Sequence, residues 1–167
     1  GGFAGEIGHQ TILAGGPLCG CGNHGCLEAL AAGPAIGRMG REAAEEGRGE
    51  ALLALVQGDV ARITARVVSQ AAAAGDATAV EIIRRAATYV GIGLANLANI
   101  LNPELFVLGG GVTHAGPLLF DTIRETIQRT AMVATRDVRV ERAVLGDDVV
   151  LWGAVALIGR QIERNAQ

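Results

Sequence analysis

The chain has 167 residues and a mass of 17.1 kDa, enough for one ordinary domain or for one lobe of a larger protein. Half of its residues are hydrophobic and 19% are charged, which indicates a folding globular chain and argues against disorder. All fourteen basic residues are arginines, so a P-loop lysine, a Schiff-base lysine and a lysine general base are excluded. The net charge of −3 gives no indication of nucleic-acid binding through bulk electrostatics.

No segment predicts a membrane span or a signal peptide. The long uncharged run over residues 86–103 contains three asparagines and two glycines, which indicates a buried helix and not a lipid-facing one. No basic start is followed by an apolar stretch. The chain begins Gly-Gly-Phe without an initiator methionine, so we expect it to be a piece of a longer protein.

The first half of the chain predicts short strands, then a loop, then helices. The loop is predicted because residues 15–26 contain all three cysteines, five glycines and a proline. Gly33-Pro34 interrupts the helical pattern that follows it. The expected elements are one or two strands within 1–14, a helix from Leu27, a short helix over 50–56, and a helix from an Asp59 N-cap through Ala74.

The second half predicts an alternation of helices and strands. Asp76 or Thr78 is a suitable N-cap for a long helix that reaches about Leu101, where Asn102-Pro103 stops it. The elements expected after it are a strand over 105–108, a turn at Gly109-Gly110-Gly111, a helix opened by Gly116-Pro117, a strand around Val138 and Val140, and a final helix over 149–164. This order predicts a single α/β unit with few strands and a dominant helical layer.

The three cysteines, Cys19, Cys21 and Cys26, lie within eight residues of one another. An odd number of cysteines does not suggest a disulfide framework. The glycines between them allow the backbone to fold tightly enough for several thiolates to point at one centre. Three cysteines and one histidine are a common ligand set for tetrahedral zinc, so we favour a zinc site over three unrelated buried thiols.

Two histidines are candidates for the fourth ligand. His24 lies inside the loop between Cys21 and Cys26, where its reach back to the same ion is awkward, and His9 lies upstream. Spacing alone favours His9 without excluding His24.

Several motifs together resemble the ROK family (repressor, open reading frame, kinase). The sequence GEIGH at 5–9, followed by CGCGNHGC at 19–26 and then Glu28, matches every fixed position of the family's sugar and zinc motifs. The resemblance covers nearly the whole chain, and the cysteine motif is its most specific part. The stretches that also agree are AGD at 74–76, LNPE at 101–104, LGGGV at 108–112 and LGDD at 145–148.

The resemblance implies an actin/hexokinase-like (ribonuclease H-like) fold, in which two α/β lobes surround a cleft. Residues 1–167 would be the C-terminal lobe, with the zinc loop at 9–26 and the N-terminal lobe outside this chain. Zinc would be held by His9, Cys19, Cys21 and Cys26 and would be structural, because it would shape the sugar-binding loop.

The resemblance also implies that Glu6, His9 and Glu28 bind the sugar. A carboxylate is a pure acceptor that can take two sugar hydroxyls. His9 could bind the metal through one ring nitrogen and the sugar through the other, so that the metal fixes the ring orientation. Without the family, Glu6 would read as a solvated strand carboxylate and Glu28 as a helix N-terminal residue favoured by the dipole.

In the family, the region of Gly109, Gly110 and Gly111 borders the adenine and ribose of ATP, which is used with Mg²⁺. Glycines after a strand allow close approach of the backbone to a nucleotide, although a plain turn fits the sequence equally well. The aspartate that accepts the sugar hydroxyl proton lies in a motif upstream of Gly1. We therefore expect this chain alone to be catalytically inactive.

Two places depart from the family pattern. Ala32 stands where many relatives have Ser, which would remove a local hydrogen bond. Val149-Val150 and Trp152 are bulkier than the residues usual at those places, which affects local packing and not the fold.

The leading functional hypothesis is a cytoplasmic, glucokinase-like enzyme that transfers phosphate from ATP to a hexose, most often a homodimer or homotetramer in this family. The alternative is a sugar-responsive ROK repressor, which would bind nucleic acid through an upstream helix-turn-helix. A third possibility is a lobe that only dimerises or binds metal. The glycine triplet favours a kinase, since nucleotide contact needs it and a repressor does not.

Overall fold

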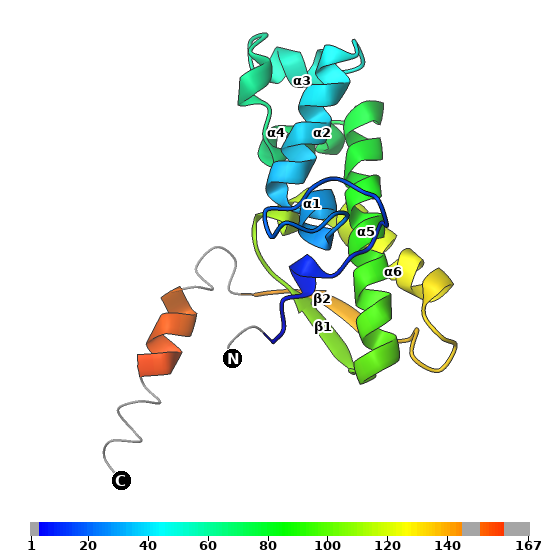
Figure 1. The fold of residues 1–167 in the computed structure, drawn as a ribbon. Helices are drawn as coiled ribbons and strands as arrows, with labels where there is room; N and C mark the ends of the chain where they lie inside the picture. The colour runs from blue at the N-terminus through cyan, green and yellow to red at the C-terminus, as the bar shows by residue number, and fades with distance from the viewer. Residues whose placement is uncertain (1–3, 145–150, 159–167) are drawn as a thin grey trace.

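Helices make up most of the computed structural model, which describes residues 4–144 and 151–158 (Figure 1). Two short strands and three 3-10 helices, named η, accompany them. In chain order the elements are η1 (Ile7–His9), α1 (Leu27–Ala31), α2 (Gly33–Glu45), α3 (Glu50–Leu55), η2 (Val60–Arg62), α4 (Ala65–Ala73), α5 (Ala77–Leu101), β1 (Leu105–Leu108), η3 (Gly111–Ala115), α6 (Pro117–Thr130) and β2 (Arg139–Arg142). This mixture, with its dominant helical layer, agrees with the expected α/β layout.

The long helix α5 is the axis on which the other elements pack (Figure 1). Its start was predicted correctly, because Asp76 Oδ1 accepts a hydrogen bond of 2.8 Å from the Ala79 amide. Its end is also confirmed: Asn102 takes a left-handed conformation with φ of 46°, and Pro103 follows it. Buried alanines and glycines line the helix, so its neighbours approach closely.

Two glycines of α5 set these close approaches. A Cβ at Gly91 would lie 2.5 Å from Thr126 Cβ of α6, and a Cβ at Gly93 would lie 3.0 Å from Gln10 Nε2 and 3.1 Å from Leu27 Cδ2. Gly91 therefore lets α6 pack against one side of α5. Gly93 lets the segment after η1 and the start of α1 pack against another.

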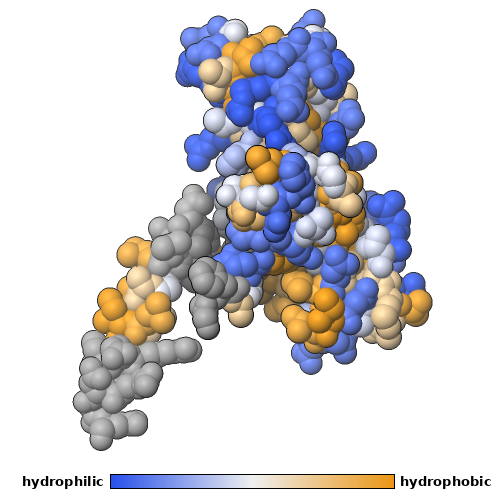
Figure 2. All heavy atoms as spheres, in the orientation of Figure 1, coloured by the Kyte–Doolittle hydropathy of each residue, from blue (hydrophilic) through white to orange (hydrophobic). Residues whose placement is uncertain are grey.

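Strands β1 and β2 pair in parallel, with Phe106 opposite Val140. Phe106 and Leu108 pack into the apolar cluster between α5 and α6, whereas Leu105 and Val107 face outward with 37% and 59% of their surface exposed. The Arg124 guanidinium of α6 donates a 2.7 Å hydrogen bond to the Val140 carbonyl and so ties α6 to β2. Figure 2 shows apolar side chains gathered at this end of the molecule.

The strands predicted within residues 1–14 are wrong for the described residues 4–14. Gly5, with φ of 94°, turns the chain into η1, and from there Thr11 forms only an isolated bridge with Cys26. Ile7 and Ile12 pack against the core, but they do so from a turning backbone and not from an extended ladder.

The single helix predicted from Asp59 through Ala74 is also wrong, because it is two elements. Asp59 does cap a helix, accepting from the Ala61 amide, but that helix is η2 and ends at Arg62. Ile63 and Thr64 are extended, which buries the Ile63 side chain completely and presents its carbonyl to Arg41 at 2.7 Å. α4 then starts at Ala65.

The end of the chain agrees with the prediction where it is described. Residues 151–158 are helical and exposed, within the final helix expected over 149–164. The LGDD motif at 145–148 and the departures at Val149 and Val150 lie outside the described residues. Among the helices that the structure describes, none is long and apolar enough to cross a membrane.

The departure at Ala32 has a local structural consequence. Ala32 is the N-cap of α2, with extended φ and ψ of −69° and 164°, and it offers no side-chain hydrogen bond to the helix. A serine hydroxyl at this position could accept from an amide of the first turn. Pro34 at the start of the helix removes one of the amides that need a partner.

Replacing Gly91 by Ala should destabilise the protein, because the new methyl group would overlap Thr126 on α6. We expect a loss of about 1–3 kcal/mol in the free energy of unfolding, typical of overpacking, which outweighs the helix-propensity gain of up to about 1 kcal/mol. Denaturant unfolding measures it. Gly153→Ala is the matched control, since a Cβ at this helical glycine meets nothing within 4 Å. Equal stability of both variants would contradict the packing argument.

Candidate metal and ligand site

The loop between η1 and α1 is folded by backbone hydrogen bonds and by glycines. The Gly25 carbonyl accepts from the Ile12 amide at 2.8 Å, and the Asn23 carbonyl accepts from the Cys19 amide at 2.8 Å. A Cβ at Gly25, whose φ is 70°, would lie 1.7 Å from the Leu13 carbonyl oxygen. Only glycine fits there, and the close crossing of the two loop segments brings the cysteines back toward η1.

The four predicted metal ligands lie together. His9 Nδ1 is 3.7 Å from Cys19 Sγ, Cys21 Sγ is 3.6 Å from Cys26 Sγ, and the four ligand atoms all lie within 4.8 Å of one another. A tetrahedral ion with Zn–S bonds of about 2.3 Å and a Zn–N bond of about 2.0 Å separates its ligand atoms by roughly 3.5–3.8 Å. The donor set and its spacing therefore fit a metal ion of this kind.

His24 lies outside the cluster. Its ring is exposed, and Nδ1 is 3.0 Å from the Gly16 carbonyl oxygen, a partner that holds the ring across the loop. Of the two histidines that the spacing left open, His9 and not His24 lies beside the cysteines.

The three thiols differ in exposure. Cys19 and Cys26 are buried, Cys21 is exposed, and all three are free. Burial, reinforced by the neighbouring sulfurs of Cys21 and Cys19, raises the pKa of Cys26 to about 12. A hydrogen bond from the Asn23 backbone lowers the pKa of Cys21. A metal ion must displace the proton of Cys26 at neutral pH, because thiolates are the ligands.

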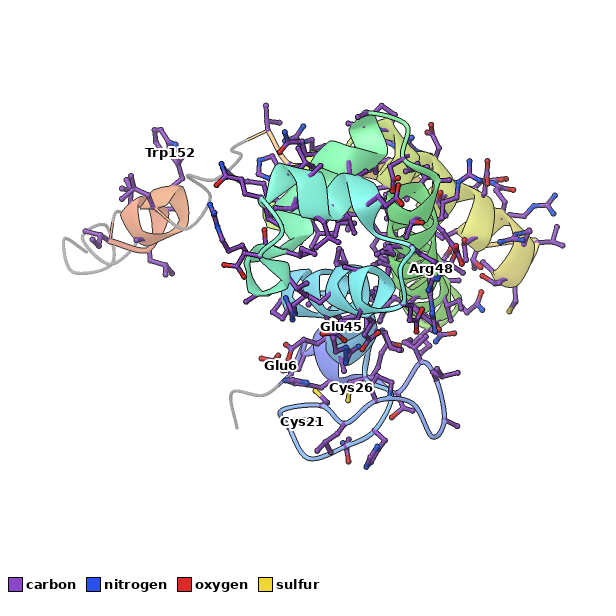
Figure 3. All side chains as sticks on the ribbon, turned by 90° about the horizontal axis from the view of Figure 1, so that it is seen from above. Glu6, Cys21, Cys26, Glu45, Arg48 and Trp152 are labelled. Atoms are coloured by element: carbon purple, nitrogen blue, oxygen red, sulfur yellow. The ribbon has the colours of Figure 1, made fainter. Side chains whose placement is uncertain are left out.

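The predicted sugar-binding residues surround this cluster. Glu28, in the first turn of α1, places Oε1 3.9 Å from Cys19 Sγ, and Glu6, exposed at the start of η1, makes no capping hydrogen bond. Figure 3 shows Glu6 together with Cys21 and Cys26 on the loop side of the molecule, away from Trp152. The Glu28 carboxylate and the His9 imidazole, from α1 and η1, thus both lie beside Cys19, and Glu6 precedes η1 directly.

A cavity of about 300 Å³ joins Glu28 to the glycine triplet. Its lining includes Gly8 and Glu28 on one side and Gly109, Val112 and Thr113 on the other. The triplet connects β1 to η3, and Gly110 has a φ of 89°, which glycine adopts without strain. Glu28 and Gly109, which are 81 positions apart in the sequence, therefore line one cavity, whereas Gly110 and Gly111 are not among its lining residues.

Sequence reasoning missed Gly8 and Thr113, which line the same cavity. Thr113 is buried, and its hydroxyl donates a 2.7 Å hydrogen bond to the Gly110 carbonyl, which fixes the turn. The sequence signal that could have identified Thr113 is its hydroxyl side chain, two positions after the last glycine of the triplet. Gly8 lies opposite Glu28, since a Cβ there would be 3.6 Å from Glu28 Cβ.

Comparison with known proteins places this arrangement in a class. The chain is 41% identical over 162 residues to a glucokinase of Halalkalibacterium halodurans, covering 96% of this chain and 49% of that protein. It is 34% identical over 158 residues to a xylose repressor of Caldicellulosiruptor bescii, covering 94% of this chain and 39% of that protein. The chain therefore spans half the length of these relatives or less.

A solved structure agrees with the sequence matches. The crystal structure of a ROK family glucokinase from Streptomyces griseus, described as a complex with glucose and AMPPNP, superposes with a TM-score of 0.83 at 37% identity. The match covers 92% of this chain and 51% of that chain. The fold is thus part of an actin/hexokinase-like lobe of the sugar-kinase class. The ROK family model matches residues 1–161, and the chain belongs to the ROK family.

The cluster predicts stoichiometric metal binding. We expect elemental analysis of the purified protein to find one equivalent of a tetrahedral transition-metal ion per chain. Cys21→Ser should reduce this content severalfold, because it removes one of four ligands. The control is His24→Ala, which should leave the content unchanged, since this ring lies outside the cluster. A metal-free wild-type protein would refute the site.

Proposed function

We propose that the full-length protein containing this chain transfers the γ-phosphoryl group of ATP, with Mg²⁺, to a hexose, and that glucose is the leading substrate. The observation that carries the proposal is the cavity lined by both Glu28 and Gly109. Phosphoryl transfer depends on positioning two substrates in line, so a sugar-binding carboxylate and a nucleotide-binding turn must face one space.

The carboxylates and the imidazole supply sugar recognition in this proposal. Glu6 and Glu28 are exposed, and an ionised carboxylate can accept hydrogen bonds from two hydroxyls of one sugar. His9 contacts Cys19 through Nδ1, which leaves Nε2 for a sugar hydroxyl. A substrate that lacks one of these hydroxyls would leave a carboxylate unpaired, which is how such a site rejects analogues.

Zinc is the metal that we propose for His9, Cys19, Cys21 and Cys26, and its role is structural. Four protein ligands fill a tetrahedral shell and leave no open position for substrate. The ion would fix the His9 ring, and with it the sugar-facing nitrogen, through the ligand bond on the opposite side.

Residues 1–167 form, in this proposal, the C-terminal lobe of a two-lobed cytoplasmic kinase that assembles as a homodimer or homotetramer. The general base is an aspartate of the upstream lobe. A second candidate function is a sugar-responsive repressor, because a curated repressor matches 94% of this chain at 34% identity. The two differ upstream, where a repressor carries a DNA-binding domain and a kinase carries the catalytic lobe.

If Glu28 binds the sugar, replacing its carboxylate by an uncharged amide should reduce catalytic efficiency with glucose. In the full-length protein, Glu28→Gln should lower kcat/KM for glucose by about 10–100-fold, because one charge-assisted hydrogen bond is worth roughly 1.5–3 kcal/mol. Steady-state kinetics with glucose varied at saturating ATP measures this. Glu45→Gln on α2 is the control, because Glu45 is an exposed glutamate that does not line the cavity. Unchanged kinetics in Glu28→Gln would remove Glu28 from the sugar site.

A second prediction follows from the proposed location of the general base in the upstream lobe. The purified 167-residue chain should phosphorylate no glucose, because the proposed general base lies outside it. A coupled assay that detects glucose 6-phosphate tests this, with the full-length protein as the positive control. Turnover by the isolated chain would mean that a base exists within residues 1–167.

A further inference from the structure

One of the three cysteines of the loop is open to solvent. The Gly22 amide donates a 3.0 Å hydrogen bond to the Cys19 carbonyl, so the chain turns tightly around Cys21. Cys21 is exposed at this turn, whereas Cys19 is 4% exposed and Cys26 is fully buried. A small solute can therefore reach the Cys21 sulfur from solvent, while the other two sulfurs are shielded.

The space around Cys21 is free of other side chains along the chain. Its neighbours on both sides are glycines, Gly20 and Gly22, and a Cβ built on either of them meets nothing within 4 Å. Gly22 has a φ of 91°, which glycine adopts without strain. The turn is thus open to a small reagent, and the Cys21 sulfur has room to shift.

A second sulfur lies directly behind Cys21, on the loop side of the molecule (Figure 3). Cys26 Sγ is 3.6 Å from Cys21 Sγ, close enough for a bond to form after a small shift of the turn. Cys26 immediately precedes α1, and its thiol donates a 3.5 Å hydrogen bond to the His9 carbonyl, so its own position is held. An accessible thiol beside a second, resolving thiol is the arrangement found in oxidant-sensitive cysteines.

We propose that Cys21 is a site of oxidative modification, where hydrogen peroxide converts Cys21 and Cys26 into a disulfide and the metal ion leaves the cluster. The proposal rests on the metal assigned to these residues in the proposed function. It goes beyond that assignment because it gives the ligands a second, reversible chemical state.

The chemistry balances with hydrogen peroxide as the oxidant. The Cys21 thiolate attacks one peroxide oxygen, the O–O bond breaks, and the sulfenic acid of Cys21 and one hydroxide form. The Cys26 thiolate then attacks the sulfenic sulfur, the S–S bond forms, and a second hydroxide leaves. Two protons from water neutralise the hydroxides. The two sulfurs have lost two electrons in total, and the peroxide has been reduced to two waters.

The disulfide changes the surroundings of His9. It removes two of the four ligands, and His9 and Cys19 alone do not fill a tetrahedral shell. The ring is then left with its 3.7 Å contact to Cys19 Sγ in place of a ligand bond. In the proposed kinase, sugar recognition by the other ring nitrogen weakens as a result.

The test is peroxide treatment of the full-length protein, followed by alkylation in two stages. Free thiols are alkylated first, disulfides are then reduced, and the new thiols are alkylated with a reagent of different mass. We expect peptide fragmentation to find the first label on Cys19 and the second on Cys21 and Cys26. A chromogenic chelator should detect about one equivalent of metal released per disulfide, and dithiothreitol with added zinc should restore the metal content.

Matched variants test the role of access to Cys21. Gly20→Val places a branched side chain in the open space beside Cys21, so it should keep the metal content of the wild type and release the ion severalfold more slowly in peroxide. His24→Ala should release the ion at the wild-type rate, since this ring lies outside the cluster.

The outcomes separate this proposal from the metal site and from the kinase function. Metal retained in excess peroxide, or metal lost without the second label on Cys21 and Cys26, would overturn the proposal and leave both the site and the function intact. A wild-type protein isolated without metal would overturn the site and this proposal together.

Discussion

The absence of side chains at two positions of α5 is the constraint on which the rest of the structure depends. Gly91 lets α6 approach on one side, and α6 carries the Arg124 contact that holds β2. Gly93 lets Gln10 and Leu27 approach on another side, so the loop that carries the cysteines lies directly on the helix. The cluster of His9 and the three cysteines and the strand that leads to the glycine triplet therefore take their relative positions from a single helix.

The loop that holds the cysteines has little apolar burial of its own. Leu13 and Leu18 are exposed, at 39% and 65%, so hydrophobic packing contributes little to its shape. Its order comes from backbone hydrogen bonds around Gly25 and, in the proposed zinc form, from ligand bonds. Structural zinc contributes roughly 10 kcal/mol or more to the folding of small zinc domains. Such a contribution would explain why this loop can be so rich in glycine.

The residues of the candidate site could be predicted from sequence because they lie in short motifs with fixed spacing. The spacing of the three cysteines and the glycines between them predicted one cluster, whereas the spacing left both His9 and His24 open and the family resemblance favoured His9. The cavity could not be predicted, because it depends on how β1 and α1 lie against α5. The error at residues 59–74 has a similar origin: the burial of Ile63 and its carbonyl contact with Arg41 override the local helical preference. The Gly5 turn likewise overrode the strand pattern at the start of the chain.

The outward face of β1 affects the tendency of the isolated chain to associate with itself. Parallel strands are normally covered on both faces, yet Leu105 and Val107 are open to solvent, and among the described residues β1 pairs only with β2. A strand with one unpaired edge and an apolar face is a template for any extended segment that meets it. The exposed face and edge of β1 thus favour self-association of the chain at high concentration.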